Sequence, residues 1–259
     1  MKRNVLNFSI GLLFVFLLSS CLDDSEDVYV SYGVIQKVDS SNSYEIITDK
    51  GNTLVVTKSH TSQVVEDNKR VLVNYGILSD KDKSKNVYEI SVNWYYNLLS
   101  KPLVNESFIL NDEEVRRDSI GNDPFNGISA QFGGDYINVN FELWHSRNSD
   151  KKHMINLVYD DMRADADTVY LRLFHNAYGE VPERGKPFDL YKGIGRCSFK
   201  ISDLLPEGVS SKPVKLTWLQ YGHDFEVKEY SDTGVFKLGA SEGKDRDISR
   251  GFESYVEVK

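Results

Sequence analysis

The stretch TLVVTKSHTSQVVEDNKRVLVNYGIL, residues 53–78, holds two strand-like runs on either side of a polar segment. Residues 53–58 and 70–78 are rich in branched apolar side chains that alternate with polar ones, which indicates β-strands. The polar residues between them, 59–69, have room for at most one short helix. Two strands separated by a gap of this size are typical of the third and fourth strands of an OB-type barrel.

Three further strand-like runs complete this pattern. Residues 28–38 and 44–49 precede the stretch, and residues 87–99 follow it after a charged loop. A barrel of about 70 residues closes its own edges and buries a core without disulfides. We therefore predict an OB-like five-stranded barrel over residues 28–100.

The chain from residue 128 onward is again rich in alternating patterns. The clearest runs are DYINVNFELWHS (135–146), HMINLVYD (153–160), DTVYLRLFHNA (167–177), KPVKLTWLQYG (212–222) and, late in the chain, ESYVEVK (253–259). Antiparallel strands with one wet face and long loops predict a β-sandwich, here over residues 128–259. The polar, proline-bearing residues 101–127 are interpreted as a linker and a short lead into the sandwich. The predicted fold class is all-β, a barrel followed by an antiparallel sandwich.

The first residues have the layout of a secretory signal peptide over residues 1–20. A basic start at Lys2 and Arg3 is followed by an apolar run and then by LSSC at residues 18–21. The apolar core is about half of the ~20 residues that span a bilayer, so a permanent transmembrane helix is not expected. LSSC resembles a bacterial lipobox, in which the cysteine is acylated and begins the mature chain. Because each buried CH₂ contributes ~0.8 kcal/mol, two or three acyl chains on Cys21 would anchor the protein stably in a membrane.

A cluster of acids follows Cys21 in a predicted tether, residues 21–27. Its members are Asp23, Asp24, Glu26 and Asp27. They could form a solvated spacer. They also resemble the acidic export signal that sends lipoproteins of Bacteroides-type bacteria to the cell surface. We favour the export signal and expect an outer-membrane protein that is exposed at the cell surface.

Charge argues against some partners. Removal of Lys2 and Arg3 leaves 29 of the 31 basic side chains against 39 acidic ones, a net charge of −10. A protein this acidic repels nucleic acid, so we expect no nucleic-acid partner. The predicted partners are the membrane, through the acyl chains on Cys21, and a protein or saccharide ligand.

No stretch carries a catalytic signature. The sequence lacks a GxSxG elbow, an HExxH motif, a P-loop and a dinucleotide fingerprint. We accordingly predict no catalytic residue and no cofactor. Carboxylates are too frequent for a glycosidase pair to be identified, so a hydrolase is the least favoured function.

Histidines near one predicted hairpin raise the question of a metal site. His145 and His153 lie at the two ends of a loop and could approach each other, with His175, Asp160 and Asp161 elsewhere in the same half. Two histidines and a carboxylate could bind zinc. Solvated loop-end histidines are the favoured interpretation, because no tight ligand spacing is present, and no metal is predicted.

Cys197 is the one cysteine besides Cys21, so no intramolecular disulfide forms if Cys21 carries lipid. Its strand-like context, GIGRCSFKI, favours a buried small hydrophobe over a nucleophile.

Two sets of side chains could form binding surfaces. In the charged loop, Lys81, Lys83 and Lys85 with Tyr88 and Trp94 would suit a nucleic acid, but Asp80 and Asp82 dilute the charge, and a solvated loop is favoured. Trp144, Tyr170 and Phe174 lie on the predicted polar faces of sandwich strands. They could bind saccharide or protein, or be covered by a crossing loop.

The whole layout resembles the NigD-like lipoproteins of Bacteroides-type bacteria. The resemblance rests on the lipobox at 18–21, on GNTLVVTKS and NKRVLVNYGIL, and on DYINVNFELW, HMINLVYD and DTVYLRLFHNAYGE. It implies an N-terminal OB domain and a C-terminal β-sandwich domain. The family's association with bacteriocin operons implies a non-catalytic binding module in bacteriocin immunity or envelope defence, the alternative being a structural or adhesive envelope protein. No functional residue is carried over, because the shared stretches are framework strands.

Overall fold

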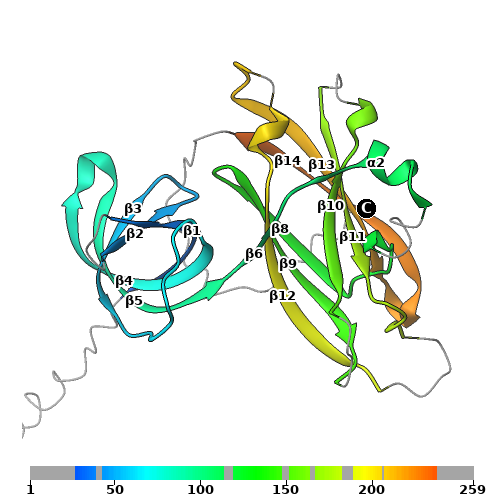
Figure 1. Ribbon diagram of the computed structural model, residues 1–259, viewed down its shortest axis with the longest axis horizontal. Coiled ribbons are helices and arrows are strands. Elements are labelled where there is room, and N and C mark those ends of the chain that lie inside the picture. The colour runs from blue at the N-terminus through cyan, green and yellow to red at the C-terminus, as the bar shows by residue number, and fades with distance from the viewer. Residues whose placement is uncertain are drawn as a thin grey trace, which may run out of the picture.

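Two β-structures follow each other along the chain, a small barrel and a two-sheet sandwich (Figure 1). The computed structural model describes residues 27–38, 43–113, 119–147, 152–163, 167–182, 189–205 and 207–237. This order confirms the predicted all-β fold class.

The barrel has five strands that close in the order β1-β2-β3-β5-β4. They are β1 (Val28–Lys37), β2 (Tyr44–Thr48), β3 (Thr53–Ser59), β4 (Arg70–Asp82) and β5 (Val87–Asn97). Alternate apolar side chains of these strands point inward and are almost fully buried, among them Ile35, Ile46, Leu54, Val71, Val73, Tyr75, Ile90 and Val92. Residues 60–69, between β3 and β4, contain one turn, at residues 67–68, and no helix.

Two local features shape the barrel. Strand β4 continues to Asp82, into the predicted charged loop, because it pairs with β5 as far as Asp82 and Val87, and a single 3₁₀ turn (η1, Lys83–Lys85) follows. A Cβ atom on Gly33 would lie 2.7 Å from Ile46 Cγ2, so a side chain there would clash where β1 crosses β2.

The sandwich has a five-stranded sheet, β14-β13-β11-β10-β7, and a four-stranded sheet, β6-β12-β9-β8. The strands are β6 (Leu99–Lys101), β7 (Val104–Asn105), β8 (Gly127–Gly133), β9 (Tyr136–His145), β10 (Met154–Tyr159), β11 (Val169–Asn176), β12 (Tyr191–Lys200), β13 (Ser211–Tyr221) and β14 (Val227–Lys237). Short helical elements are α2 (Glu106–Leu110), η3 (Asp161–Arg163), η4 (Ser202–Leu204) and η5 (His223–Phe225).

The predicted inward faces form the sandwich core. Ile137, Val139, Phe141 and Leu143 of β9 are buried, as are the corresponding residues of the strands opposite, Leu171 and Leu173 of β11 and Val214, Leu216 and Trp218 of β13. Alternation predicted these faces because side chains in a strand point to opposite sides of the sheet in turn. The sandwich was predicted to be antiparallel, and this is wrong for three strand pairs in its described part: β6–β12, β7–β10 and β11–β13 pair in parallel.

Much of the predicted linker belongs to the sandwich. Only Leu98 separates the end of β5 from the start of β6, and β6 pairs with β12. Phe125 is 0% exposed in the sandwich core. Its position reflects the many apolar contacts that a ring gains there, which outweigh the polar character of its neighbours in sequence.

A buried polar network joins the barrel to the sandwich. Arg70, 3% exposed at the start of β4, forms an ion pair with Asp49 of the β2–β3 turn. It also donates to Asn138 Oδ1 of β9 at 2.9 Å and to Ser198 Oγ of β12 at 3.4 Å. Asn138 donates in turn to Asp49 Oδ2 at 2.7 Å, and the Arg70 guanidinium lies 4.1 Å from the centre of the Tyr136 ring.

This network places the barrel against the outer face of the four-stranded sheet. That sheet lies on the barrel side of the sandwich (Figure 1). Because a buried charge is costly unless it is paired and hydrogen-bonded, the network favours one fixed arrangement of the two domains.

Candidate functional site

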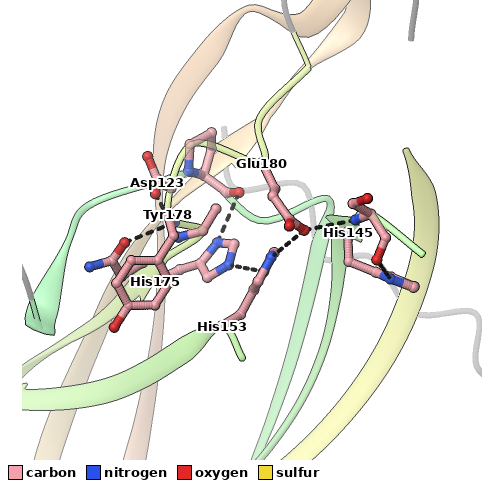
Figure 2. A network of polar contacts seen from close by, with 10 residues as sticks. Asp123, His145, His153, His175, Tyr178 and Glu180 are labelled. Atoms are coloured by element: carbon pink, nitrogen blue, oxygen red, sulfur yellow. Dashed lines mark hydrogen bonds and ion pairs between the residues drawn. The ribbon is translucent and has the colours of Figure 1, made fainter. Parts of the chain in front are cut away.

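A polar cluster in the sandwich contains two of the histidines considered above, but not the pair that is closest in the sequence. His153, just before β10, lies beside His175 of β11 (Figure 2). The antiparallel pairing of β10 with β11 brings them together, because Ile155 is opposite His175. His145 is at the end of β9 and contacts the backbone carbonyl of Ser146.

The cluster is a chain of three side chains. His153 Nδ1 lies 2.9 Å from His175 Nε2, and His153 Nε2 lies 3.1 Å from Glu180 Oε2. Glu180 also accepts the backbone N–H of Ser146 at 2.7 Å. Figure 2 shows Glu180 between His153 and the segment that carries His145. The chain therefore links the end of β9 to the residues before β10 and after β11.

The partners decide where the protons are. His175 Nδ1 lies 3.4 Å from the carbonyl oxygen of Pro124, which can only accept, so this nitrogen carries a proton. The lone pair of His175 Nε2 then accepts from His153 Nδ1. The Glu180 carboxylate is an acceptor as well, so His153 makes both contacts only when both of its nitrogens are protonated.

Burial controls the second histidine of the chain. The His175 side chain is 2% exposed, and its ring stacks on Phe125 with ring centres 4.9 Å apart. Desolvation, and then the charge of His153, lower the pKa of His175 to about 4. The two rings therefore have different positions in the chain: His175 is a neutral acceptor, and His153 lies between it and the Glu180 carboxylate.

The backbone around the cluster is held in place by one backbone acceptor and two side-chain acceptors. The backbone N–H of Asp123 donates to the His175 carbonyl at 2.7 Å, and Asp123 Oδ2 accepts the N–H of Ala177 at 2.7 Å. Tyr178 has a φ of 51°, and its N–H donates to Asn176 Oδ1 at 2.9 Å. The turn that carries Glu180 is thus fixed on both sides.

The residues considered for zinc are not brought together as a ligand set. Asp161 accepts from Ser107, and Asp160 pairs with Arg163 at 3.0 Å, so both are bound to other partners. Within the described residues, no group of three or more histidine, cysteine or acidic side chains could hold a metal ion. Sequence reasoning missed Glu180, because a single acid after a strand carries no signal of its own.

Cys197 is buried in the sandwich core, which confirms the favoured interpretation. It is 0% exposed, and burial raises the pKa of its thiol to about 12. A thiol is the nucleophile only as thiolate, so this cysteine is unreactive at neutral pH.

The three lysines of the charged segment are solvated as predicted, although Lys81 belongs to β4 and Lys83 and Lys85 to a 3₁₀ turn rather than to a loop. Lys81 pairs with Glu89, Lys83 with Asp80 and Lys85 with Asp82, all as exposed ion pairs.

The three predicted surface aromatics do not form one surface. Tyr170 and Phe174 are on β11 of the five-stranded sheet, and each packs under an arginine, Arg163 and Arg172 respectively. Trp144 is on β9 of the other sheet, beside Phe225 and under Lys192.

A different exposed set lies on β5 and β12, on the side where barrel and sandwich meet. Trp94 and Tyr96 of β5 are 45% and 44% exposed, and Ile194 of β12 is 62% exposed. The Arg196 guanidinium lies 5.6 Å from the centre of the Tyr96 ring and so connects the two strands.

The N-terminal predictions lie outside the described residues, except for Asp27, which is exposed. These are the signal peptide, Cys21 and the other three acids. In the part of the chain that the structure describes, no helix has the length and hydropathy needed to cross a membrane.

Comparison with known proteins supports both halves of the fold. A model of the NigD-like N-terminal OB domain matches residues 32–98, and a model of the NigD-like C-terminal beta sandwich domain matches residues 107–231. No curated protein matches the chain.

Several solved structures share the fold. A protein of unknown function (DUF1344) from Bacteroides vulgatus has a TM-score of 0.61 at 22% identity, covering 86% of this chain and 97% of its own. A NigD-like immunity protein from Bacteroides caccae has a TM-score of 0.58 at 20% identity, covering 80% and 92%. A candidate lipoprotein from Bacteroides fragilis has a TM-score of 0.53 at 10% identity, covering 83% and 100%.

Proposed function

The chain belongs to the NigD-like family, and from that premise we propose that it is a lipid-anchored protein of the cell envelope that acts by binding, without catalysis, in bacteriocin immunity or envelope defence. The acyl chains on Cys21 hold it in the outer membrane, and the acids Asp23, Asp24, Glu26 and Asp27 direct it to the cell surface. The similar structures described as an immunity protein and as a candidate lipoprotein support this proposal.

The observation that carries a binding role is the exposed set on β5 and β12. Large apolar side chains such as Trp94 and Ile194 contribute little to stability when they face water, and the contact of Arg196 with Tyr96 connects the two strands that carry them. The buried histidine chain has a structural role in this proposal. Its partners in the described structure are groups of the protein itself, so it fixes loops of the sandwich.

Anchoring is tested by Cys21→Ala. The wild-type protein should fractionate with the outer membrane and leave it only with detergent, whereas the variant should be an unprocessed or soluble precursor. Equal detergent-dependent fractionation of the two would refute lipidation.

Surface display is tested by replacing the four acids with serine and asparagine. This change should preserve membrane association but protect the protein from proteinase added to intact cells, while the wild type is digested. A periplasmic protein is the control. A protected wild type would refute display at the surface.

Immunity is tested by deleting the gene and exposing the cells to a bacteriocin-producing strain of the same genus. Greater sensitivity that is restored by the wild-type gene but not by the Cys21→Ala gene is expected. Unchanged sensitivity would refute the immunity role.

A second candidate function is structural or adhesive, with recognition of a saccharide. The half-exposed rings of Trp94 and Tyr96 favour it, because aromatic rings at a surface stack on flat faces of sugars. Screening on immobilised glycans, with Trp94→Ala as the variant, separates this function from protein binding.

A further inference from the structure

The short helix α2 is apolar on both its inner and its outer side. Its last three residues are Phe108, Ile109 and Leu110. Ile109 packs into the sandwich and is 4% exposed, whereas Phe108 and Leu110 are 58% and 53% exposed. A surface helix normally turns polar residues to the solvent, and a helix that is apolar all round is normally covered. The outer side of α2 therefore has the composition of a buried helix face.

The 3₁₀ turn η3 extends this apolar surface. The backbone N–H of Ser107 donates to Asp161 Oδ1 at 2.9 Å, and the Ser107 hydroxyl donates to Asp161 Oδ2. Phe108 and Met162 directly follow these two residues, and Met162 is 63% exposed. Single exposed hydrophobes are common at protein surfaces, but these three lie on two elements that are hydrogen-bonded to each other.

This surface is built on the outer face of the five-stranded sheet. Ile109 belongs to a small apolar cluster whose other members are Ile120, Val158, Val104 and Phe174. Val158 of β10 and Phe174 of β11 point away from the sandwich core, because their neighbours Leu157 and Leu173 lie within it. The helix is therefore held on the sheet, and its outer side chains are presented from a fixed backbone, which lowers the entropy lost on binding.

The position of α2 is remote from the proposed anchor. Figure 1 shows α2 on the side of the sandwich away from the barrel. Val28 begins the barrel seven residues after Cys21, and seven residues span at most about 25 Å. The anchor proposed at Cys21 is thus attached to the barrel side, and α2 faces away from it.

Acids outnumber cations beside the apolar side chains. The charged groups that act on Glu106, the first residue of α2, are Asp160, Asp161, Arg163 and Arg172. Burial, and then the charge of Asp160, raise the pKa of the Glu106 carboxyl. Asp160 pairs with Arg163 at 3.0 Å, and Arg172 pairs with Glu229 of β14 at 3.4 Å. Because Arg172 is neutralised by Glu229, three acids remain beside one arginine.

From these observations we infer that the outer surface of α2 and η3 is a docking surface for a basic, amphipathic segment of a partner protein. The apolar face of that segment covers Phe108, Leu110 and Met162, and its cations face Glu106 and Asp161. We base this on the proposed binding role, and the surface is separate from the exposed set on β5 and β12.

The same charges argue against two other occupants. A second copy of the chain would bring its own acids against those of the first, and like charges across an interface are costly. An anionic lipid surface is repelled for the same reason. A basic segment instead gains from both features of the surface, its acids and its apolar side chains.

The test uses the mature chain, residues 21–259, with Cys21→Ser, so that no detergent competes for the probe. It retains all of the described residues. The probe is the labelled basic peptide LKKLLKLLKKLLKL, and fluorescence anisotropy should show saturable binding that weakens with salt. The peptide LEELLELLEELLEL keeps the apolar face and reverses the charge, so it should not bind. No saturable binding of the lysine peptide, or equal binding of both peptides, would overturn the inference.

Neutral variants locate the site. Phe108→Gln and Met162→Gln should each weaken binding about fivefold or more, because each removes an apolar contact without changing the charge. Glu106→Gln should weaken it about twofold and reduce its salt dependence. Val64→Gln and Glu66→Gln are the matched controls, because both side chains are on the barrel between β3 and β4 and are 80% and 58% exposed. Equal losses in the controls, or unchanged binding by Phe108→Gln and Met162→Gln, would refute the site.

Other occupants of the surface give distinct results. If the chain binds the peptide only after Arg116→Ser/Arg117→Ser, its own residues 114–118 occupy the surface. If phosphatidylglycerol vesicles bind the chain but not its Phe108→Gln variant, the surface is a membrane contact. If gel filtration shows a dimer that Phe108→Gln dissociates, the occupant is a second copy. Each of these results would refute a basic partner segment, and none changes the tests of anchoring and immunity, so failure here is distinguishable from failure of the proposed function.

Discussion

Acidification should destabilise this protein through His175. The pKa of this ring in the folded protein is about 4, against 6.5 for an unperturbed histidine. Between these values the unfolded chain takes up a proton that the folded chain does not. Stability is therefore fully present above pH 6.5 and is lost as the pH falls towards 4. With 1.36 kcal/mol for each pKa unit, the free energy of unfolding should fall by about 2.5 kcal/mol between pH 7 and pH 4.5 from this group alone.

The variant His175→Asn removes the titrating group. The asparagine Nδ2 can donate to the Pro124 carbonyl as His175 Nδ1 does, but it does not ionise in this range. Loss of the ring stacked on Phe125 should cost about 2–3 kcal/mol at pH 7. The informative quantity is the pH dependence: the variant should lose about 2.5 kcal/mol less than wild type between pH 7 and pH 4.5.

Urea unfolding followed by tryptophan fluorescence, at half-unit steps of pH, measures this difference. Titration of carboxylates contributes to both proteins and cancels in the comparison. His223→Asn is the control, because the His223 side chain is 96% exposed. If wild type and His175→Asn lose the same free energy on acidification, His175 is not kept neutral by burial, and the proton arrangement derived for the chain is wrong.

Three further predictions concern the junction, the buried thiol and the domain limits. Arg70→Met should lower the free energy of unfolding by about 3–5 kcal/mol, because it leaves Asp49 partly buried without its cation. Urea unfolding measures this loss. If the double variant Arg70→Met/Asp49→Leu recovers it, the ion pair is the cause. Cys197 should resist alkylation by iodoacetamide in the folded protein and react in urea, because its thiol is buried with a pKa of about 12. Mass spectrometry measures the alkylation, and fast reaction of the folded protein would contradict the burial of this thiol. We also propose the domain limits 28–100 and 128–259, which limited proteolysis checks because β7 and Phe125 within 101–127 pack into the sandwich. First cuts between residues 101 and 127, with fragments that co-elute in gel filtration through the Arg70 network, would support these limits. A resistant fragment that includes residues 101–127, or first cuts inside 28–97, would contradict them.

The amino-acid sequence was sufficient for the fold class because strand periodicity is local. Alternating residues such as Ile137, Val139 and Phe141 must face one way in any strand, so the core faces of both domains followed from spacing alone. The same holds for Cys197, whose apolar neighbours in sequence predicted its burial. Strand direction did not follow, because parallel and antiparallel strands show the same alternation, and β6 and β7 were too short to leave a pattern.

The site depended on contacts between residues far apart in the sequence. His145 and His153 were considered together because they are close along the chain, and solvated histidines were favoured, but the β10–β11 register placed His153 beside His175 and brought Glu180 to its other nitrogen. Arg70 looked like an ordinary strand residue, and only docking of the barrel on the sandwich buried it among Asp49, Asn138 and Ser198. Periodicity decides which way a side chain points, whereas tertiary packing decides which distant group it meets and whether water reaches it, and these determine its charge and its chemistry.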